Sequence, residues 1–256
     1  MKTNQKKELV VGVLGMPDNQ NTPLLIQYLL SNDIYIDFVV YWEPSFKDQY
    51  KRLLRKMKFR GIIPTIERIF YAVFKSQAKK KTNHKNQFKE YYVPSHNSLK
   101  CQEILKNENV DILLLATDSI ILQKILKIPN VATLNAHPGW VPQFRGLGSM
   151  GFQLEAGKFP AVSVHQVDEG IDTGPLILRE YIKVNPTDGL DLIEEKTSLL
   201  QKKLFLKVIK MFQQNKVKYI DTFEEPSNMS RGMSWKQRRS LDRKLKSGLI
   251  KLTPPG

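Results

Sequence analysis

The sequence has little cysteine and no long apolar run. Its single cysteine, Cys101, excludes an internal disulfide framework and a multi-cysteine metal site, and it suits a reducing compartment such as the cytoplasm. No segment approaches the roughly 20 apolar residues that a membrane-spanning helix needs. The apolar stretch near the N-terminus is shorter than the core of a typical signal peptide. We therefore expect a cytoplasmic protein without a membrane span.

Acidic residues are scarce beside basic ones. The chain has 40 Lys and Arg against 25 Asp and Glu, which gives a net charge of +15. This excess suggests anionic ligands or a negatively charged surface as partner, without deciding between them. The remaining composition is ordinary: 41% of the 256 residues are hydrophobic and 25% are charged. The chain is therefore expected to fold as one large domain, or as a domain with a small appendage.

Short apolar runs alternate with amphipathic segments, which is the order from which parallel sheets are built. We expect strands at 9–15, 36–42, 110–117, 131–137, 159–168 and 175–184. We expect helices between them at 21–32, 98–109 and 119–130. The pattern predicts an α/β fold with a Rossmann-like, mostly parallel sheet flanked by helices.

Two regions depart from this alternation. From about 43 to 92, long basic side chains alternate with apolar ones at helical spacing, which predicts a basic helical insert of two helices and a lysine run. It would cover the sheet; the alternative is a basic platform for a nucleotide, a nucleic acid or a membrane surface. A long amphipathic helix with a capped, acid-rich start is expected at about 188–214, before a polar tail with weak order signals. The predicted domains are 1–185, which contains the insert, and a short C-terminal helical extension, 186–256.

Polar side chains gather where the strand at 131–137 ends. Asn135 and His137 lie two residues apart, so they project from the same face of the sheet. In an open parallel sheet, ligands bind beyond the carboxyl ends of the strands. The glycine-rich turn VDEGIDTGP follows the next strand and supplies Asp168, Glu169 and Asp172. Each residue alone fits a structural role, and only their conjunction favours a functional site.

The segment LNAHPGWVPQFRG, followed by SVHQVDEGIDTGPLI, resembles the paired signature of the folate-dependent formyltransferase family. The family pattern is Asn-x-His-Pro at one strand end and Asp-x-Gly-Pro in a later turn. The resemblance covers roughly residues 110–185, with weaker agreement in the opening strand and helix. It implies that 1–185 is a catalytic domain that transfers a formyl group from 10-formyltetrahydrofolate to an amine through a tetrahedral intermediate, without a metal.

The same resemblance implies roles for individual residues. Asn135 and protonated His137 would donate hydrogen bonds to the oxyanion that forms on the formyl group, and Asp172 would orient the imidazole and help to remove the proton of the amine. The pterin ring of the folate would contact Ser119, Ile120, Ile121, Asp168, Glu169 and Gly170. The loop after His137 permits a cis peptide bond before Pro142. His165 is interpreted as a structural strand residue, and His96 carries no functional signal.

The amine acceptor is less clearly specified. The loop GMPDNQNTP lacks the phosphate-binding sequence of the glycinamide ribonucleotide enzymes, and the region after the last core strand looks helical, unlike the RNA-contacting barrel of the methionyl-tRNA enzymes. Both features favour an amino sugar carried on a nucleotide, as used in polysaccharide biosynthesis, with those two acceptors as alternatives and nucleic acid not the expected partner. The insert would shape the acceptor pocket or pair the subunits of a homodimer. The alternative from another class is a non-catalytic, basic nucleic-acid-binding module on the same scaffold.

Overall fold

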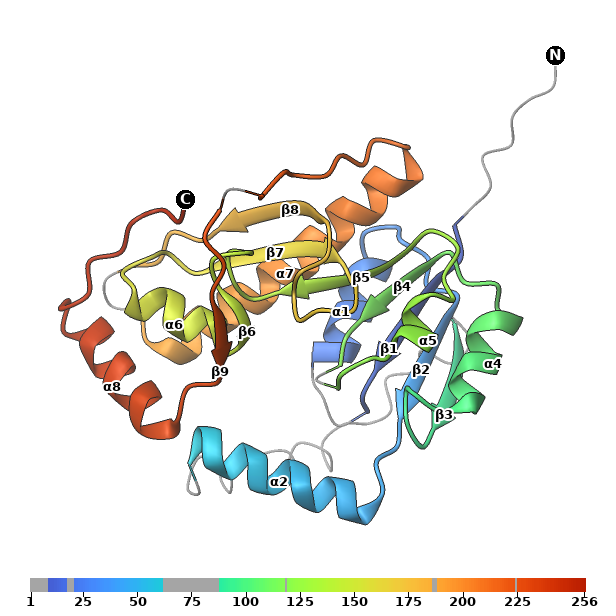
Figure 1. Ribbon diagram of the computed structural model, residues 1–256, viewed down its shortest axis with the longest axis horizontal. Helices are drawn as coiled ribbons and strands as arrows, with labels where there is room; N and C mark the ends of the chain where they lie inside the picture. The colour runs from blue at the N-terminus through green and yellow to red at the C-terminus, as the bar shows by residue number, and fades with distance from the viewer. Residues whose placement is uncertain (1–8, 18–20, 62–87, 118, 186–187, 224) are drawn as a thin grey trace.

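A mostly parallel sheet forms the centre of the molecule, and helices cover both of its faces (Figure 1). The computed structural model describes residues 9–17, 21–61, 88–117, 119–185, 188–223 and 225–256. In this part of the chain the sheet has seven strands in the order β3-β2-β1-β4-β5-β7-β8. Their bounds are β1 Val11–Gly15, β2 Phe38–Trp42, β3 Lys89–Val93, β4 Ile112–Leu115, β5 Ala132–His137, β7 Ala161–Gln166 and β8 Leu176–Tyr181. The predicted α/β fold is confirmed.

Strand direction reverses twice across the sheet, once on each side of β7. Strands β3, β2, β1, β4 and β5 pair in parallel, whereas β7 is antiparallel to β5 and to β8. A separate parallel pair joins β6 (Arg145–Leu147) to β9 (Met229–Arg231). The helices are α1 Asn21–Leu30, α2 Phe46–Arg60, α4 Leu99–Asn107, α5 Gln123–Leu126, α6 Ser149–Glu155, α7 Leu190–Gln213 and α8 Trp235–Lys246. None of these described helices has the length and apolar character to cross a bilayer.

Alternate residues of the buried strands face two different apolar layers. In β1, Val11 and Val13 pack in the cluster that includes side chains of α1 and α7, and Leu14 packs in the cluster that includes α4 and α5. Close contact between strands depends on Gly12, because a Cβ at this position would lie only 2.4 Å from the ring of Phe38. The core therefore fixes the carboxyl ends of β1, β2, β4 and β5 at one edge of the sheet.

The predicted helical insert at 43–92 differs from the structure in its last residues, which form a strand. Helix α2 confirms the first helix, and the second predicted helix and the lysine run fall largely at 62–87, outside the described residues. Residues 89–93 are an edge strand, β3, paired in parallel with β2. The strand was not predicted because it begins with the charged residues Lys89 and Glu90. Charged side chains of this kind are typical of edge strands, where they prevent pairing with another chain.

The region after residue 185 contains the two helices α7 and α8 and the short strand β9. Helix α7 packs on the sheet through Leu204, Phe205, Val208 and Ile209, so it belongs to the helical cover of the main core. The start of α7 has Asp191 in its first turn, and its Leu190 N–H donates to the carboxylate of Asp242 in α8, at 2.8 Å. The tail is more ordered than expected, because it forms β9 and α8, and α8 begins with a capping box of Ser234 and Gln237.

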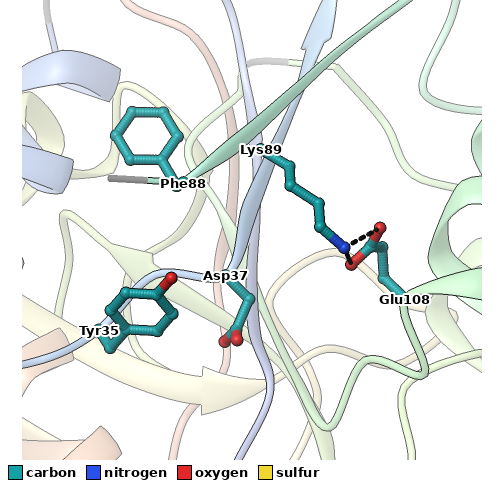
Figure 2. Close-up of a pocket in the computed structure, with 5 residues that line it drawn as sticks. All are labelled: Tyr35, Asp37, Phe88, Lys89 and Glu108. Atoms are coloured by element: carbon teal, nitrogen blue, oxygen red, sulfur yellow. Dashed lines mark hydrogen bonds and ion pairs between the residues drawn. The ribbon is translucent and has the colours of Figure 1, made fainter. Parts of the chain in front are cut away.

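A cleft of about 340 Å³ lies beside the amino ends of β2 and β3 (Figure 2). It is lined by Tyr35, Asp37, Phe88, Lys89 and Glu108. Lys89 and Glu108 form an ion pair of 2.9 Å across it. Its polar residues are thus partly satisfied by one another, and the cleft is remote from the carboxyl edge that carries Asn135 and His137.

Candidate active site

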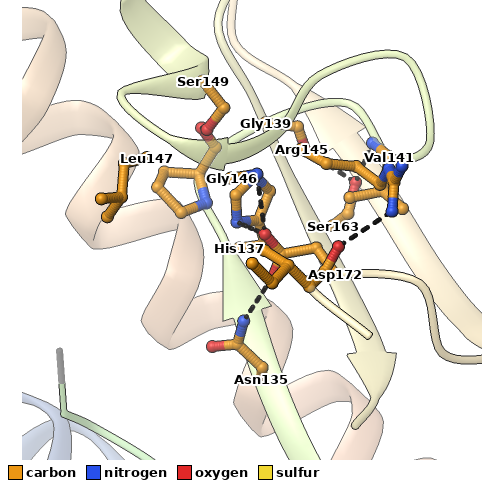
Figure 3. A network of polar contacts seen from close by, with 12 residues as sticks. Asn135, His137, Gly139, Val141, Arg145, Gly146, Leu147, Ser149, Ser163 and Asp172 are labelled. Carbon is orange, nitrogen blue, oxygen red and sulfur yellow. Dashed lines mark hydrogen bonds and ion pairs between the residues drawn. The ribbon is translucent and has the colours of Figure 1, made fainter. Parts of the chain in front are cut away.

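Asn135, His137 and Asp172 meet at the carboxyl end of β5 (Figure 3). The Nδ1 atom of His137 lies 3.1 Å from Oδ2 of Asp172, and Nδ2 of Asn135 lies 3.2 Å from Oδ1 of the same carboxylate. The alternation of β5 places Asn135 and His137 on one face, and the turn between β7 and β8 brings Asp172 to them. The structure thus brings together the three residues that the sequence singles out, and their catalytic roles remain a prediction.

Asp172 is the centre of the polar network. Its backbone has a positive φ of 52°, which Asp adopts more readily than most residues and which aims its side chain back at β5. The backbone N–H of Gly146 donates to Oδ2 at 2.9 Å. Burial by itself would raise the pKa of Asp172, but the contact with His165, the charge of His137 and the Gly146 N–H hold that pKa well below its usual range. Asp172 is therefore a fixed negative charge.

His137 faces an acceptor at each ring nitrogen. Nε2 donates to the carbonyl of Phe144 at 3.0 Å, while Nδ1 faces Asp172. A protonated ring satisfies both acceptors, whereas a neutral ring satisfies only one. Burial lowers the pKa of His137, and the negative charge of Asp172 opposes that shift. The negative charge of Asp172 therefore offsets the effect of burial and favours a proton on Nδ1. This balance suits a residue that must gain and lose a proton during a reaction.

His165 belongs to the same network, although the sequence analysis treated it as structural. Its Nδ1 lies 3.0 Å from the carbonyl oxygen of Gln166, and its Nε2 lies 3.3 Å from Nδ2 of Asn135 and 3.4 Å from Oδ1 of Asp172. That Nδ2 also faces Asp172, which fixes the orientation of the amide. Among the described residues, the oxygen of Asn135 has no hydrogen-bond partner. No sequence motif marks this role, which follows from the register that pairs His165 with Asn135 across β5 and β7.

The loop that follows His137 is tied down at several points. Ser163 of β7 donates to the carbonyl of Gly139 at 2.7 Å and accepts from the N–H of Val141 at 3.0 Å. The peptide bond between Val141 and Pro142 is cis, as the sequence permits. Gly139 admits the Phe144 carbonyl, because a Cβ there would lie 2.5 Å from that oxygen. The acceptor of His137 is thus built by its own loop.

The predicted folate contacts lie on two loops near the carboxyl edge. In the first loop, Ile120 is 78% exposed, while Ile121 packs in the core beside α4 and α5. Ser119 contacts Thr117 at 2.9 Å and Nδ1 of His96 at 3.3 Å. His96 is buried and its Nε2 contacts the Val40 carbonyl, so it links β2 to the loop with Ser119.

In the second loop, Asp168 is a turn former. Its Oδ1 accepts from the N–H of Gly170 at 3.0 Å and from Oγ1 of Thr173 at 2.7 Å. Glu169 is exposed. This turn fixes the path of the chain into Asp172. Within the described parts of the chain, no group of three or more His, Cys, Asp and Glu residues could hold a metal ion.

Comparison with known proteins identifies the family. The family model described as formyl transferase matches residues 65–209, more than half of the chain. The methionyl-tRNA formyltransferase of Prochlorococcus marinus (strain AS9601) is 37% identical over 113 residues, which cover 43% of this chain and 34% of that protein. The chain spans between 34% and 41% of the length of the curated relatives it matches.

Solved structures share the fold. A sugar N-formyltransferase from Shewanella sp FDAARGOS_354 has a TM-score of 0.56 at 15% identity, covering 87% of this chain and 77% of the other. Phosphoribosylglycinamide formyltransferase from Anaplasma phagocytophilum has a TM-score of 0.58 at 20% identity, covering 87% and 98%. These likenesses concern the fold, and the family model supplies the assignment. With its mostly parallel sheet and the Asn, His and Asp cluster within the matched segment, the chain belongs to the formyl transferase family.

Proposed function

We propose that this protein transfers a formyl group from 10-formyltetrahydrofolate to the amine of an amino sugar carried on a nucleotide. The observation that carries the proposal is the contact of one carboxylate, Asp172, with both His137 and Asn135, inside the segment that the family model matches. An amide, an imidazole and a carboxylate are suited to acyl transfer to an amine, which needs hydrogen bonds to a developing charge and a route for a proton.

In this proposal His137 stabilises the negative charge that develops on the formyl oxygen. Its Nε2 donates to the Phe144 carbonyl, so the formyl oxygen takes the place of that carbonyl when the substrates bind. Asp172 keeps Nδ1 protonated and the ring correctly oriented. Because burial favours the neutral ring, His137 is also able to exchange a proton during the reaction.

Asn135 acts on the amine rather than on the formyl oxygen. Both Asp172 and His165 face its Nδ2, so the amide nitrogen is already committed within the protein. Its oxygen remains to accept an N–H of the attacking amine and to orient the nitrogen lone pair towards the formyl carbon. The expectation from the sequence is a hydrogen bond from the amide nitrogen of Asn135 to the formyl oxygen.

The residues near Ser119 fit a folate. The donor supplies the formyl carbon, and its flat pterin ring needs an apolar surface beside hydrogen-bonding groups. Asn97 holds this loop from both sides: its Nδ2 donates to the Ile120 carbonyl and its Oδ1 accepts from the Leu122 N–H, each at 2.8 Å. These two hydrogen bonds fix the loop that carries Ser119 and the exposed Ile120, which we assign to one side of the pterin ring. We assign Asp168, Glu169 and Gly170 to the other side of the ring.

The acceptor assignment rests on charge and on the loop after β1. A net charge of +15 favours a diphosphate-linked acceptor and an anionic folate tail. The sequence GMPDNQNTP departs from the phosphate loop of the glycinamide ribonucleotide enzymes. Methionyl-tRNA is the second candidate acceptor, because the curated relatives with that name are up to 37% identical to this chain over the matched segment.

The test is a mass measurement on a panel of amines. The protein is incubated with 10-formyltetrahydrofolate and, separately, with amino-sugar nucleotides, charged methionyl-tRNA and glycinamide ribonucleotide. We expect an amino-sugar nucleotide to gain one formyl group, and no acceptor to gain one with His137→Ala. Formylation of methionyl-tRNA alone would show that the proposed amino-sugar acceptor is wrong. A protein that formylates none of them but retains nucleic acid at moderate salt would be the non-catalytic binding module.

A further inference from the structure

A segment outside the family match reaches the loop that carries the partners of the candidate catalytic residues. The match ends at residue 209, and residues 225–231, here called the C-terminal clamp, follow it. Strand β9 of the clamp pairs with β6, which follows the His137 loop directly (Figure 1). The clamp is therefore a feature of this chain that the matched segment does not contain.

Ser230 holds the two carbonyls on either side of Gly146. Its hydroxyl lies 3.0 Å from the carbonyl oxygen of Arg145 and 2.7 Å from that of Leu147, so one proton is shared between two acceptors. Gly146 is opposite Ser230 in the register of the two strands. A Cβ on Gly146 would lie 2.4 Å from the Ser230 carbonyl, and the φ of Gly146 is +83°, so only glycine permits this approach.

The peptide held by Ser230 is the one that contacts Asp172. The Gly146 N–H donates to Oδ2 of Asp172 at 2.9 Å, and the same oxygen lies 3.1 Å from Nδ1 of His137 (Figure 3). Beside it, Arg145 donates from Nη1 to the Ile171 carbonyl at 3.0 Å, immediately before Asp172 in the chain. The orientation of Gly146 thus sets one of the hydrogen bonds that fix the Asp172 carboxylate.

A second anchor holds the earlier part of the loop. Arg179 of β8 donates to the Val141 carbonyl at 2.7 Å and lies 4.2 Å from the ring centre of Trp140. Its two terminal nitrogens donate to both carboxylate oxygens of Glu225, at 2.8 and 2.7 Å. A bidentate pair of this kind has a fixed geometry. The clamp therefore contacts the loop near Gly146 and, through Arg179, near Val141.

We propose that Ser230 is a positioning residue for the active site, acting through the Gly146 peptide on Asp172 and hence on His137. The proposal rests on the proposed function for its kinetic consequences, and its structural part does not require turnover. A catalytic group must be held within about half an ångström of its working position by its supporting contacts. The C-terminal clamp supplies that support from beyond the matched segment.

The kinetic test compares Ser230→Ala, Ser230→Thr and Ser247→Ala. Ser247 is an exposed serine on the same tail whose hydroxyl donates to the Lys244 carbonyl of its own helix, so it is the matched control. Removing a hydrogen bond worth about 1 kcal/mol should lower kcat of Ser230→Ala by roughly fivefold, with KM for the formyl donor nearly unchanged. Ser230→Thr keeps the hydroxyl and should recover most of kcat, and Ser247→Ala should match the wild type. An unchanged kcat in Ser230→Ala would overturn the proposal, as would a threonine variant no better than alanine.

A second measurement separates this proposal from the proposed function. The ¹⁵N chemical shifts of the His137 imidazole are recorded in the wild type and in the two alanine variants, without substrates. We expect the shifts to change in Ser230→Ala and not in Ser247→Ala. Unchanged shifts in a folded Ser230→Ala protein would refute the positioning role, whether or not the wild type transfers a formyl group. If Ser230→Ala does not fold, Glu225→Gln replaces it, and it should change the same shifts by loosening the anchor on Arg179.

Discussion

The Asp172 carboxylate decides the protonation of its neighbours. It accepts from a backbone N–H and lies against two imidazoles and an amide, so it is strongly favoured in its charged form. A charged Asp172 favours a proton on Nδ1 of His137 and the Phe144 carbonyl accepts one from Nε2, while burial opposes a ring that carries both. At this scale the proposed chemistry depends on one buried negative charge with a defined set of partners.

Burial of His137 makes folding stability depend on pH. Because the folded state lowers the pKa of His137, the unfolded chain binds its proton more readily. Stability from this residue is therefore present above the unfolded pKa of about 6.5 and is lost as the pH falls towards the folded value. We expect the free energy of unfolding to fall between pH 7 and pH 5, and to fall less in His137→Asn, when both proteins are unfolded in urea.

Asp172 does not disturb this comparison. Its pKa is also lowered by folding, so its contribution is fully present above its unfolded value of about 3.9 and is lost only below it. Equal losses of stability in the wild type and in His137→Asn between pH 7 and pH 5 would show that His137 keeps an ordinary pKa in the folded protein.

The sequence predicts the site residues better than their partners. Asn135, His137 and Asp172 stand in two recognisable motifs, and the strand period places the first two together. His165 and His96 do not stand in such a motif. His165 contacts Asn135 and Asp172, and His96 contacts Ser119 and the Val40 carbonyl. Contacts of this kind follow from the packing of strands and loops, which the sequence pattern does not specify.

At the scale of elements, the long buried strands and helices are predictable, and the short ones are not. Strand β1 is fully buried and reads as a continuous apolar run. Strands β3, β6 and β9 are short or charged, and each depends on a partner strand from a distant part of the chain. The weak order expected for the tail was wrong for the same reason: α8 is stabilised by Leu241 and Leu245, which pack with Met150, Leu154 and Ile193.

The junction of α7 and α8 provides a test at this scale. Asp242 of α8 accepts from the Leu190 N–H at the start of α7, and it also pairs with Lys246. Loss of a helix cap typically costs about 1 kcal/mol. We expect Asp242→Ala to lower the free energy of unfolding by about that amount, measured in urea, and Asp242→Asn, which keeps the accepting oxygen, to lose less. Equal losses would assign the effect to the charge and not to the cap.

At the scale of the whole molecule, the carboxyl edge of the sheet collects every part of the proposed site. Strand β5 supplies Asn135 and His137, the turn before β8 supplies Asp172, and β9 approaches from the far end of the chain (Figure 1). Helices α2 and α8, both rich in basic residues, contact each other near this edge. The net positive charge of the chain favours anionic substrates.

The central claim is that Asp172, with His137 and Asn135, performs formyl transfer. The most direct test measures the rate at which an amino-sugar nucleotide gains one formyl mass from 10-formyltetrahydrofolate, in the wild type, Asp172→Asn and Asp33→Asn. Asp33 is an exposed Asp that also has a positive φ, of 62°, so it is a matched control for the same substitution. We predict a loss of roughly a hundredfold to a thousandfold in Asp172→Asn and none in Asp33→Asn. Wild-type rates in Asp172→Asn would contradict the account.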